Sequence, residues 1–167
     1  SGATILGIGD AGGFRQFSNS VRMIRRPEDL KGLKMRSNGM DTINKTLEAL
    51  GAEVMIVPYN DLYMALKSGA IDGQENPLAN IYTSSLQDVQ TYLSLTGHMY
   101  DAAPLAVNTA WFETLPEEYQ TILFEEADKA REVDLQENDE SKYLELLKEA
   151  GMEINEVDKE AFQEAMS

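Results

Sequence analysis

Residues 30–77 alternate apolar strands with amphipathic helices, and this alternation limits the fold more than any other feature of the sequence. The predicted strands are short runs of residues that favour β-structure. The predicted helices carry apolar residues at helical spacing and end at Gly51 and Gly69. In chain order the predicted elements are a strand at 33–36, a helix at 41–50, a strand at 53–58, a helix at 60–69 capped by Asn60, and a brief strand and turn at 70–73. This order predicts an α/β layer with a mostly parallel sheet.

The rest of the chain continues the mixed pattern at both ends. Before the alternating region we predict a buried strand at 3–9, a glycine turn at 10–13 and a single helical turn that starts at Pro27. After it we predict a helix at 78–86, strands near 91–96 and 103–107, a long helix opened by a capping box at 114–117, a strand at 152–154 and a last helix at 158–166. The apolar stripe of the long helix lapses across 134–142. A helix with such a polar middle bridges two lobes or kinks between them.

Charge is unevenly distributed along the 167 residues. Residues 1–100 have a net charge of −1, residues 101–167 have a net charge of −14, and the first 40 residues alone have a net charge of +4. The acidic tail would repel phosphates, which excludes nucleic-acid binding by that part of the chain. The basic opening leaves room for an anion site near the N-terminus. The acidic helix is most simply a solvated surface, and docking of a protein partner on it is the alternative function.

The sequence lacks the residues that several chemistries require. It has no cysteine, which excludes disulfides, thiolate metal sites and a cysteine nucleophile. Because His98 is its one histidine, a zinc site would need three carboxylates. No apolar run approaches the ~20 residues of a membrane span, so we expect no membrane insertion. We expect neither a metal nor a cofactor.

Three residue groups could imitate a catalytic or phosphate site, and each has a simpler explanation. Asp72 and Glu75 could do acid–base chemistry with His98, but Asp72 and Gly73 form a good turn sequence. The glycines at 7–13 lack the lysine–serine pair of a P-loop, and no serine lies in a nucleophile elbow. We therefore expect a protein that is not an enzyme.

Two arginines are better candidates for a binding site. Arg15 follows the glycine turn, and Arg36 ends a predicted strand. In open α/β sheets, ligands collect beyond the carboxyl ends of the strands. An arginine at that position can hold a carboxylate through two parallel hydrogen bonds, which lysine cannot do equally well.

A series of motifs runs through nearly the whole chain. It comprises LKGLKMR at 30–36, YNDLYMAL at 59–66, IDGQENP at 71–77, LSLTGH at 93–98, and the segment from Trp111 to Pro116. In this series the chain resembles the substrate-binding proteins of TRAP transporters, the tripartite ATP-independent periplasmic uptake systems. The DGQENP segment is close to a signature of that family.

The resemblance implies a periplasmic α/β protein with the two-lobe fold of periplasmic binding proteins, here mainly the second lobe plus a long crossover helix. On the family plan, residues 13–101 form the second-lobe domain, 102–141 cross over to complete the first lobe, and 142–167 return to the second lobe. Most of the first lobe would precede this sequence. Since the crossing elements would then expose apolar surface, we expect the chain to dimerise, swap elements or stay associated with a cleaved N-terminal piece.

The resemblance also implies a solute receptor for a small organic acid, which docks on TRAP membrane subunits. In the family an arginine at the position of Arg36 pairs with the substrate carboxylate, a second at Arg15 assists, the asparagine at Asn76 orients the carboxylate, and an aromatic residue at Tyr59 packs against the ligand. The family commonly follows the key arginine with a small apolar residue and proline. Here the segment 37–39 is Ser-Asn-Gly, which makes the pocket edge more polar. Without the opposite lobe, we expect the chain to bind its ligand weakly.

Overall fold

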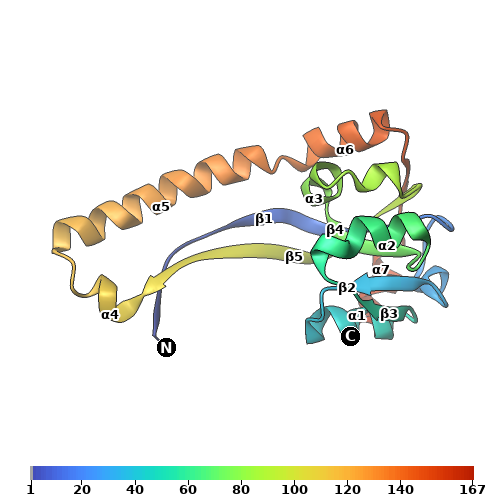
Figure 1. Cartoon of the computed structure of the whole chain (residues 1–167), viewed down its shortest axis with the longest axis horizontal. Coiled ribbons are helices and arrows are strands. Elements are labelled where there is room, and N and C mark those ends of the chain that lie inside the picture. The colour runs from blue at the N-terminus through green and yellow to red at the C-terminus, as the bar shows by residue number, and fades with distance from the viewer. Residues whose placement is uncertain (1) are drawn as a thin grey trace.

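A six-stranded sheet forms the centre of the protein, with strand order β3-β2-β4-β1-β5-β6 (Figure 1). The computed structural model describes residues 2–167. The strands are β1 (Ala3–Asn19), β2 (Lys34–Ser37), β3 (Glu53–Ile56), β4 (Gly73–Pro77), β5 (Tyr92–Asn108) and β6 (Glu153–Glu156). The helices are α1 (Asp41–Ala49), α2 (Leu62–Ser68), α3 (Leu78–Thr83), α4 (Thr109–Phe112), α5 (Glu117–Glu137), α6 (Glu140–Glu149) and α7 (Lys159–Ala165), with short 3-10 helices at Pro27–Leu30, Tyr59–Asp61 and Leu86–Asp88.

The predicted α/β class is confirmed, but the sheet is less parallel than expected. The pairs β2–β3, β2–β4 and β5–β6 are parallel, whereas the central strand β1 runs antiparallel to both β4 and β5. The turn predicted at 10–13 is wrong, because β1 runs through these residues as one strand of 17 residues from Ala3 to Asn19. The two strands predicted near 91–96 and 103–107 are likewise one strand, β5.

Three local predictions of caps and turns are also wrong. Asn60 lies inside a 3-10 helix, and α2 begins at Leu62 without a side-chain cap. The box at 114–117 does not cap α5, whose N-cap is Pro116. Asp72 and Gly73 do not end a strand: Gly73 begins β4, and the signature residues up to Pro77 are fully within that buried strand.

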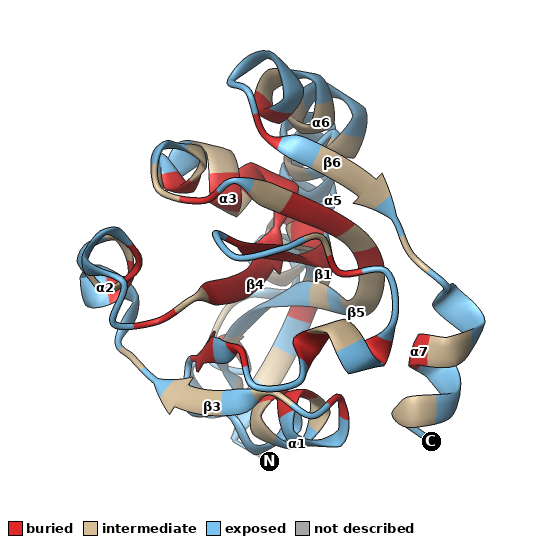
Figure 2. Ribbon diagram, turned by 90° about the vertical axis from the view of Figure 1, so that its right-hand side faces the viewer, coloured by how far each residue is buried: buried red, intermediate tan, exposed pale blue. Residues whose placement is uncertain are grey.

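Most of the hydrophobic core lies at one end of the molecule, which we call the body. The body comprises β2, β3, β4, β6, residues 14–19 of β1, residues 92–101 of β5 and the helices packed on them. Buried residues concentrate on β4 and the adjoining parts of β1 and β5 (Figure 2). Two apolar clusters fill it: one includes Phe17, Met35, Leu47 and Phe162, and the other includes Leu66, Ile81, Leu93 and Leu147.

The remainder extends away from the body as an arm (Figure 1). The arm comprises residues 3–10 of β1, residues 102–108 of β5, α4 and α5. Its buried cluster is small, consisting of Leu6, Phe112 and Ala127. Of the 21 residues of α5, Ala127 alone is buried, while Ile8 and Ile122 are 57% and 48% exposed. The arm therefore presents apolar surface that the described chain, residues 2–167, does not cover.

The arm joins the body where β1 is irregular and the long helix breaks. The β1–β5 register shifts between Asp10 and Gly13, and Gly12 and Gly13 have φ values of 113° and 88°, a region that favours glycine. Beside this bulge, α5 ends and α6 begins after two intervening residues. The kink predicted from the lapse at 134–142 is therefore present.

Side chains from the helix break hold the bulge through its backbone. Asp134 Oδ2 accepts a hydrogen bond from the Asp10 amide at 2.6 Å, and Asn138 Nδ2 donates to the Asp10 carbonyl at 3.0 Å. Glu140 Oε1 accepts from the Phe14 amide at 2.8 Å. These bonds tie two of the three connections between arm and body, β1 and the α5–α6 break, into one junction; the third connection is β5.

Candidate functional site

The sheet brings together the residues that the sequence places far apart. Arg36 lies on β2, Asn76 on β4 and Arg15 on β1, and these three strands are neighbours in the order β2-β4-β1. Tyr59 follows β3, on the other side of β2. All four predicted site residues therefore come from the same region of the body.

Arg36 is held on two sides but keeps its terminal nitrogens available. Its Nε donates to the Val57 carbonyl at 2.9 Å, and its guanidinium carbon lies 5.7 Å from the centre of the Tyr59 ring. Tyr59 is itself fixed, because its hydroxyl hydrogen-bonds Ser84 Oγ at 2.6 Å. Within residues 2–167, the two terminal nitrogens of Arg36 have no hydrogen-bond or ion-pair partner, although the residue is only 3% exposed.

Arg15 has the opposite environment, since acceptors from the same chain surround it. Its Nε and Nη2 donate to the two carboxylate oxygens of Glu75, the second at 2.8 Å, and Nη1 donates to Asp101. Nη2 also donates to the Glu75 carbonyl at 2.8 Å and to Asn76 Oδ1 at 3.1 Å. After these bonds, one hydrogen on Nη1 remains for a ligand.

Asn76 is oriented by this same group. Its Oδ1 accepts from Arg15, and its Nδ2 donates to Gln74 Oε1, whose own amide donates to Ser18 Oγ at 2.8 Å. Because each of these side chains is buried and bonded, the amide of Asn76 keeps one fixed orientation, with one N–H free.

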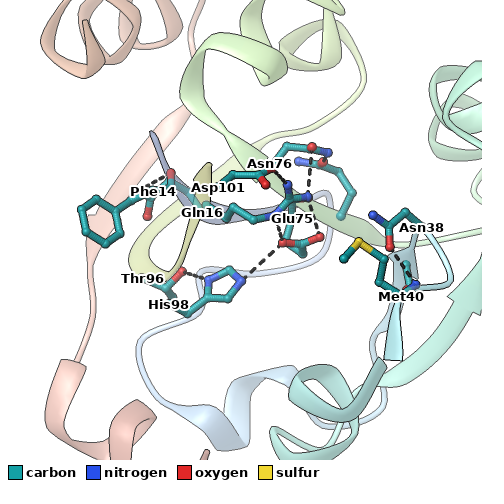
Figure 3. Close-up of polar contacts among 12 residues, drawn as sticks. Phe14, Gln16, Asn38, Met40, Glu75, Asn76, Thr96, His98 and Asp101 are labelled. Carbon is teal, nitrogen blue, oxygen red and sulfur yellow. Dashed lines mark hydrogen bonds and ion pairs between the residues drawn. The ribbon is translucent and has the colours of Figure 1, made fainter. Parts of the chain in front are cut away.

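Glu75 connects Arg15 to a buried histidine, His98, which lies beside Glu75 in Figure 3. His98 Nε2 lies 3.4 Å from Glu75 Oε2, while His98 Nδ1 shares a hydrogen bond with Thr96 Oγ1 at 2.8 Å. The imidazole stacks on Phe17 with ring centres 4.3 Å apart and planes 2° from parallel. The Glu75 side chain is 1% exposed, so its charge is compensated entirely by neighbouring side chains.

The pKa shifts follow from burial and from these charges. Burial lowers the pKa of Arg36, and the Arg15 charge acts in the same direction, whereas Glu75 opposes them. Burial would also lower the pKa of Arg15, but its hydrogen bonds and charge interactions with Glu75 and Asp101 outweigh burial and raise it. Burial would raise the pKa of Glu75, but hydrogen bonds from His98 and Arg15 lower it below its usual 4.5. The shifts favour the charged forms of Arg15 and Glu75 at neutral pH. Arg36 is charged as well, because a guanidinium group does not lose its proton in proteins.

The site can therefore bind an anion but is poorly suited to acid–base catalysis. Arg36 offers four N–H donors in a planar fork, and Arg15 and Asn76 offer one each. Glu75 and His98 do lie together, as an acid–base pair would, but Arg15 occupies both carboxylate oxygens of Glu75. Asp72 lies outside the group and accepts from the Lys34 amide at 2.8 Å.

Sequence reasoning missed the counter-ions of Arg15. In the sequence Glu75 is a candidate only for acid–base chemistry, and no motif includes Asp101. No local pattern in the sequence marks these two counter-ions, because the burial that makes Glu75 require a cation follows only from the fold. Among residues 2–167, no group of three His, Asp or Glu side chains is arranged to hold a metal ion. In the same range no helix is long and apolar enough to cross a membrane.

The sequence is similar to characterised periplasmic binding proteins. It is 34% identical over 157 residues to the 2,3-diketo-L-gulonate-binding periplasmic protein YiaO of Escherichia coli, which covers 92% of this chain and 48% of that protein. It is 30% identical over 149 residues to the C4-dicarboxylate-binding periplasmic protein DctP of Rhodobacter capsulatus, covering 84% of this chain and 44% of that protein. The chain thus spans about half the length of these relatives.

The fold matches solved structures of the same kind. A TRAP periplasmic solute-binding protein from Sulfitobacter sp. NAS-14.1, with bound β-D-galacturonate, superposes with a TM-score of 0.91 at 33% identity and is matched over 99% of this chain and 55% of that one. The family model of the bacterial extracellular solute-binding proteins, family 7 (DctP), matches residues 1–167. The predicted family and its periplasmic-binding-protein fold are confirmed, and the chain belongs to the DctP family of TRAP solute-binding proteins.

Proposed function

We propose that this protein is the solute receptor of a TRAP-type uptake transporter and that Arg36 binds the carboxylate of a small organic acid. The observation that carries the proposal is the state of Arg36: a buried guanidinium, fixed by Val57 and Tyr59, with both terminal nitrogens unpartnered within residues 2–167. A buried charge without a partner is costly, and an anion would compensate it.

The other predicted site residues have supporting roles in this proposal. Arg15 contributes its one free N–H, and its positive charge is largely offset by Glu75 and Asp101. Asn76 contributes a second directional donor. Tyr59 supplies the ring on which Arg36 rests, and its 46% exposure leaves ring surface for a ligand.

Ligands of related structures support an anionic solute. Three solved TRAP proteins illustrate this. The protein from Polaromonas sp. JS666 binds D-erythronate, the protein from Sulfurospirillum deleyianum binds succinate, and the protein from Fusobacterium nucleatum binds sn-glycerol-3-phosphate. All three are anions whose oxygens can accept two parallel hydrogen bonds from arginine. We expect the ligand of this chain to be a carboxylate, because the relatives that bind β-D-galacturonate, D-erythronate and 2,3-diketo-L-gulonate all bind carboxylates.

We further propose that the arm completes the first lobe of a longer protein. Residues 102–141 would pack against chain beyond this sequence, because α5 exposes apolar side chains and the relatives are about twice as long. Closure of both lobes would exclude water from Arg36, so this chain alone would bind weakly. We place the receptor in the periplasm, where it would deliver solute to TRAP membrane subunits.

The magnitudes are consistent with this proposal. Hydrogen bonds to charged groups contribute about 1.5–3 kcal/mol each. Three or four of them with burial reach the about −8 kcal/mol of a micromolar complex, provided that water is excluded.

Isothermal titration calorimetry of the full-length protein against D-galacturonate, D-erythronate and succinate tests the role of Arg36. Replacing Arg36 with Ala should abolish measurable binding of the acid that the wild type binds. Arg26→Ala is the matched control, since that side chain is 68% exposed and pairs only loosely with Asp158. Unchanged affinity in Arg36→Ala would contradict the proposal.

A further inference from the structure

Strand β5 contains a large bulge beside the site. The β1–β5 register shifts between Arg15 and Phe17, where β1 advances by two residues and β5 by five. Within residues 2–167, this leaves residues 95–98 without a ladder partner on β1. Gly97, inside the bulge, has a φ of 54°, a conformation that favours glycine. The backbone of the bulge therefore needs another hydrogen-bond partner.

The side chain of Gln16 supplies this partner. Its Oε1 accepts a hydrogen bond from the Gly97 amide at 2.8 Å, and its Nε2 donates to the Phe14 carbonyl at 3.2 Å. Because a carbonyl can only accept, the bond to Phe14 fixes the Nε2 branch there and leaves the Oε1 branch for Gly97. Gln16 is only 5% exposed, so the amide is held inside the protein rather than in solvent.

The bulge carries two residues of the site, one on each side of Gly97. Thr96 Oγ1 shares a hydrogen bond with His98 Nδ1 at 2.8 Å, and His98 Nε2 lies 3.4 Å from Glu75 Oε2 (Figure 3). The Glu75 carboxylate in turn accepts from two nitrogens of Arg15. The path of the backbone at Gly97 therefore determines where the imidazole lies relative to Glu75.

We infer that Gln16 is a positioning residue of the anion site, which holds the β5 bulge so that His98 stays beside Glu75. Its effect on a ligand rests on the proposed function, because Gln16 reaches the ligand only through Glu75 and the free N–H of Arg15. Without the bond to Gly97, the bulge loosens and the Glu75 carboxylate loses one of its partners. The free N–H of Arg15 is then held less firmly for the ligand.

The imidazole of His98 reports on this position without a ligand. It stacks on Phe17 with ring centres 4.3 Å apart, so the ring current should shift its carbon-bound protons upfield in ¹H–¹³C NMR of the full-length protein. Gln16→Met keeps the length of the side chain but loses the amide, and His98 should lose most of this shift. Gln163→Met, at an exposed position on α7, is the matched control and should leave the His98 signal unchanged.

Gln16→Glu separates the bond to Gly97 from the packing of the side chain. A carboxylate oxygen still accepts from the Gly97 amide, although it cannot donate to the Phe14 carbonyl. The His98 shift should therefore return in this variant, in samples that circular dichroism shows to be folded. A shift that is unchanged in Gln16→Met, or lost equally in both variants, would overturn the inference. If Gln16→Glu does not fold, the comparison of Gln16→Met with Gln163→Met decides.

Calorimetry of the full-length protein with D-galacturonate, D-erythronate and succinate tests the step from His98 to the ligand. Gln16→Met should bind the acid that the wild type binds about two- to tenfold more weakly, the ratio expected for one neutral hydrogen bond. Unchanged affinity would overturn the inference while the proposed function stands. If the wild type binds none of the acids, or Arg36→Ala binds as the wild type does, the proposed function fails, and the His98 shift still decides whether Gln16 holds the bulge.

Discussion

Glu75 is a carboxylate that lies between two buried basic side chains and touches almost no solvent. It determines how much of Arg15's charge is left for a ligand, since it occupies two donors of that guanidinium through its carboxylate. The site thus contains one arginine, Arg15, whose charge is neutralised within the protein and one, Arg36, whose charge is not. This difference between two identical side chains arises entirely from what the neighbouring strands place beside them.

We expect Glu75→Gln to destabilise the protein by about 3 kcal/mol at pH 7, because it leaves the buried Arg15 with only the partly exposed Asp101 as counter-ion. The pKa of Glu75 is lower in the folded protein than its ordinary 4.5, so the unfolded chain binds more protons than the folded one below that pH. The stabilisation by this carboxylate is therefore present above pH 4.5 and is lost as the pH falls through the folded pKa. Urea unfolding between pH 3 and 7 measures both effects.

The variant should show a shallower acid decline than the wild type, since it lacks the titrating group. Glu48→Gln, an exposed position on α1, serves as the control and should unfold like the wild type. If Glu75→Gln and the wild type had the same free energy of unfolding at pH 7, the ion pair of Glu75 with Arg15 would make no net contribution to stability.

Among individual residues, the sequence predicted the arginines of the site better than the carboxylates that pair with them. Arg36, Arg15 and Asn76 are recognisable from motifs that are contiguous in the chain. The counter-ions are not, because Glu75 and Asp101 reach Arg15 only when β4 and β5 pair with β1, 60 and 86 residues away. Long-range pairing of this kind leaves no local signature.

Among the secondary-structure elements, β4 has the most restricted environment. It begins at Gly73, where an added Cβ would lie 2.7 Å from Asn19 Cβ and 2.8 Å from Met35 Sδ and would collide with the Ser18 carbonyl. The neighbouring strands β1 and β2 thus approach β4 more closely than any side chain would allow at this position. That approach also sets the spacing between Arg36 and Asn76.

Gly73→Ala should therefore destabilise the protein by about 1–3 kcal/mol, the cost of overpacking a core, and it should loosen the β2–β4–β1 arrangement that positions the site. Gly7→Ala is a matched control within β1, because its new methyl would meet only Ala127 at an ordinary 3.8 Å. Thermal unfolding of the two variants compares them. Similar midpoints for both would show that the backbone relaxes around residue 73 at no cost.

The spacing of apolar residues predicted the helices and strands that are defined by neighbouring residues. The prediction failed where the same residues, such as a pair of glycines, occur in two different structures. The helix expected at 41–50 is α1, because its apolar spacing and Gly51 define both its face and its end. Gly12 and Gly13 have positive φ in a bulge just as they would in a turn, so the continuity of β1 could not be predicted from them. The paired strand β5, about 90 residues away, decides between the two.

At the scale of the whole molecule, two parts differ in how completely they are packed. The body buries two apolar clusters, whereas the arm buries three residues and exposes Ile8, Leu105 and Ile122. Half of the −14 charge of residues 101–167, a net charge of −7, falls on the helices α5 and α6. The acidic part still contributes to the predicted anion site, because Asp101 pairs with Arg15.

We expect this chain alone to self-associate through the apolar face of the arm in a concentration-dependent way. Ile8→Glu should reduce the association, because it places a charge on that face at a position that is 57% exposed. Val21→Glu, on the body and 47% exposed, is the control and should associate like the wild type. Size-exclusion chromatography with light scattering gives the masses, and a strictly monomeric wild type would contradict the prediction.

The junction of β1 and the α5–α6 break also has a mechanical consequence. The 21 residues of α5 make a rod about 32 Å long, so a rotation of about 15° at its base would carry α4 through about 8 Å. Arg15 lies one residue beyond Phe14, whose amide belongs to the junction, and would hardly move. The hydrogen bonds of Asp134, Asn138 and Glu140 at the junction hold the angle between the arm and the body. A small change in that angle would therefore produce a much larger displacement at the far tip of the arm.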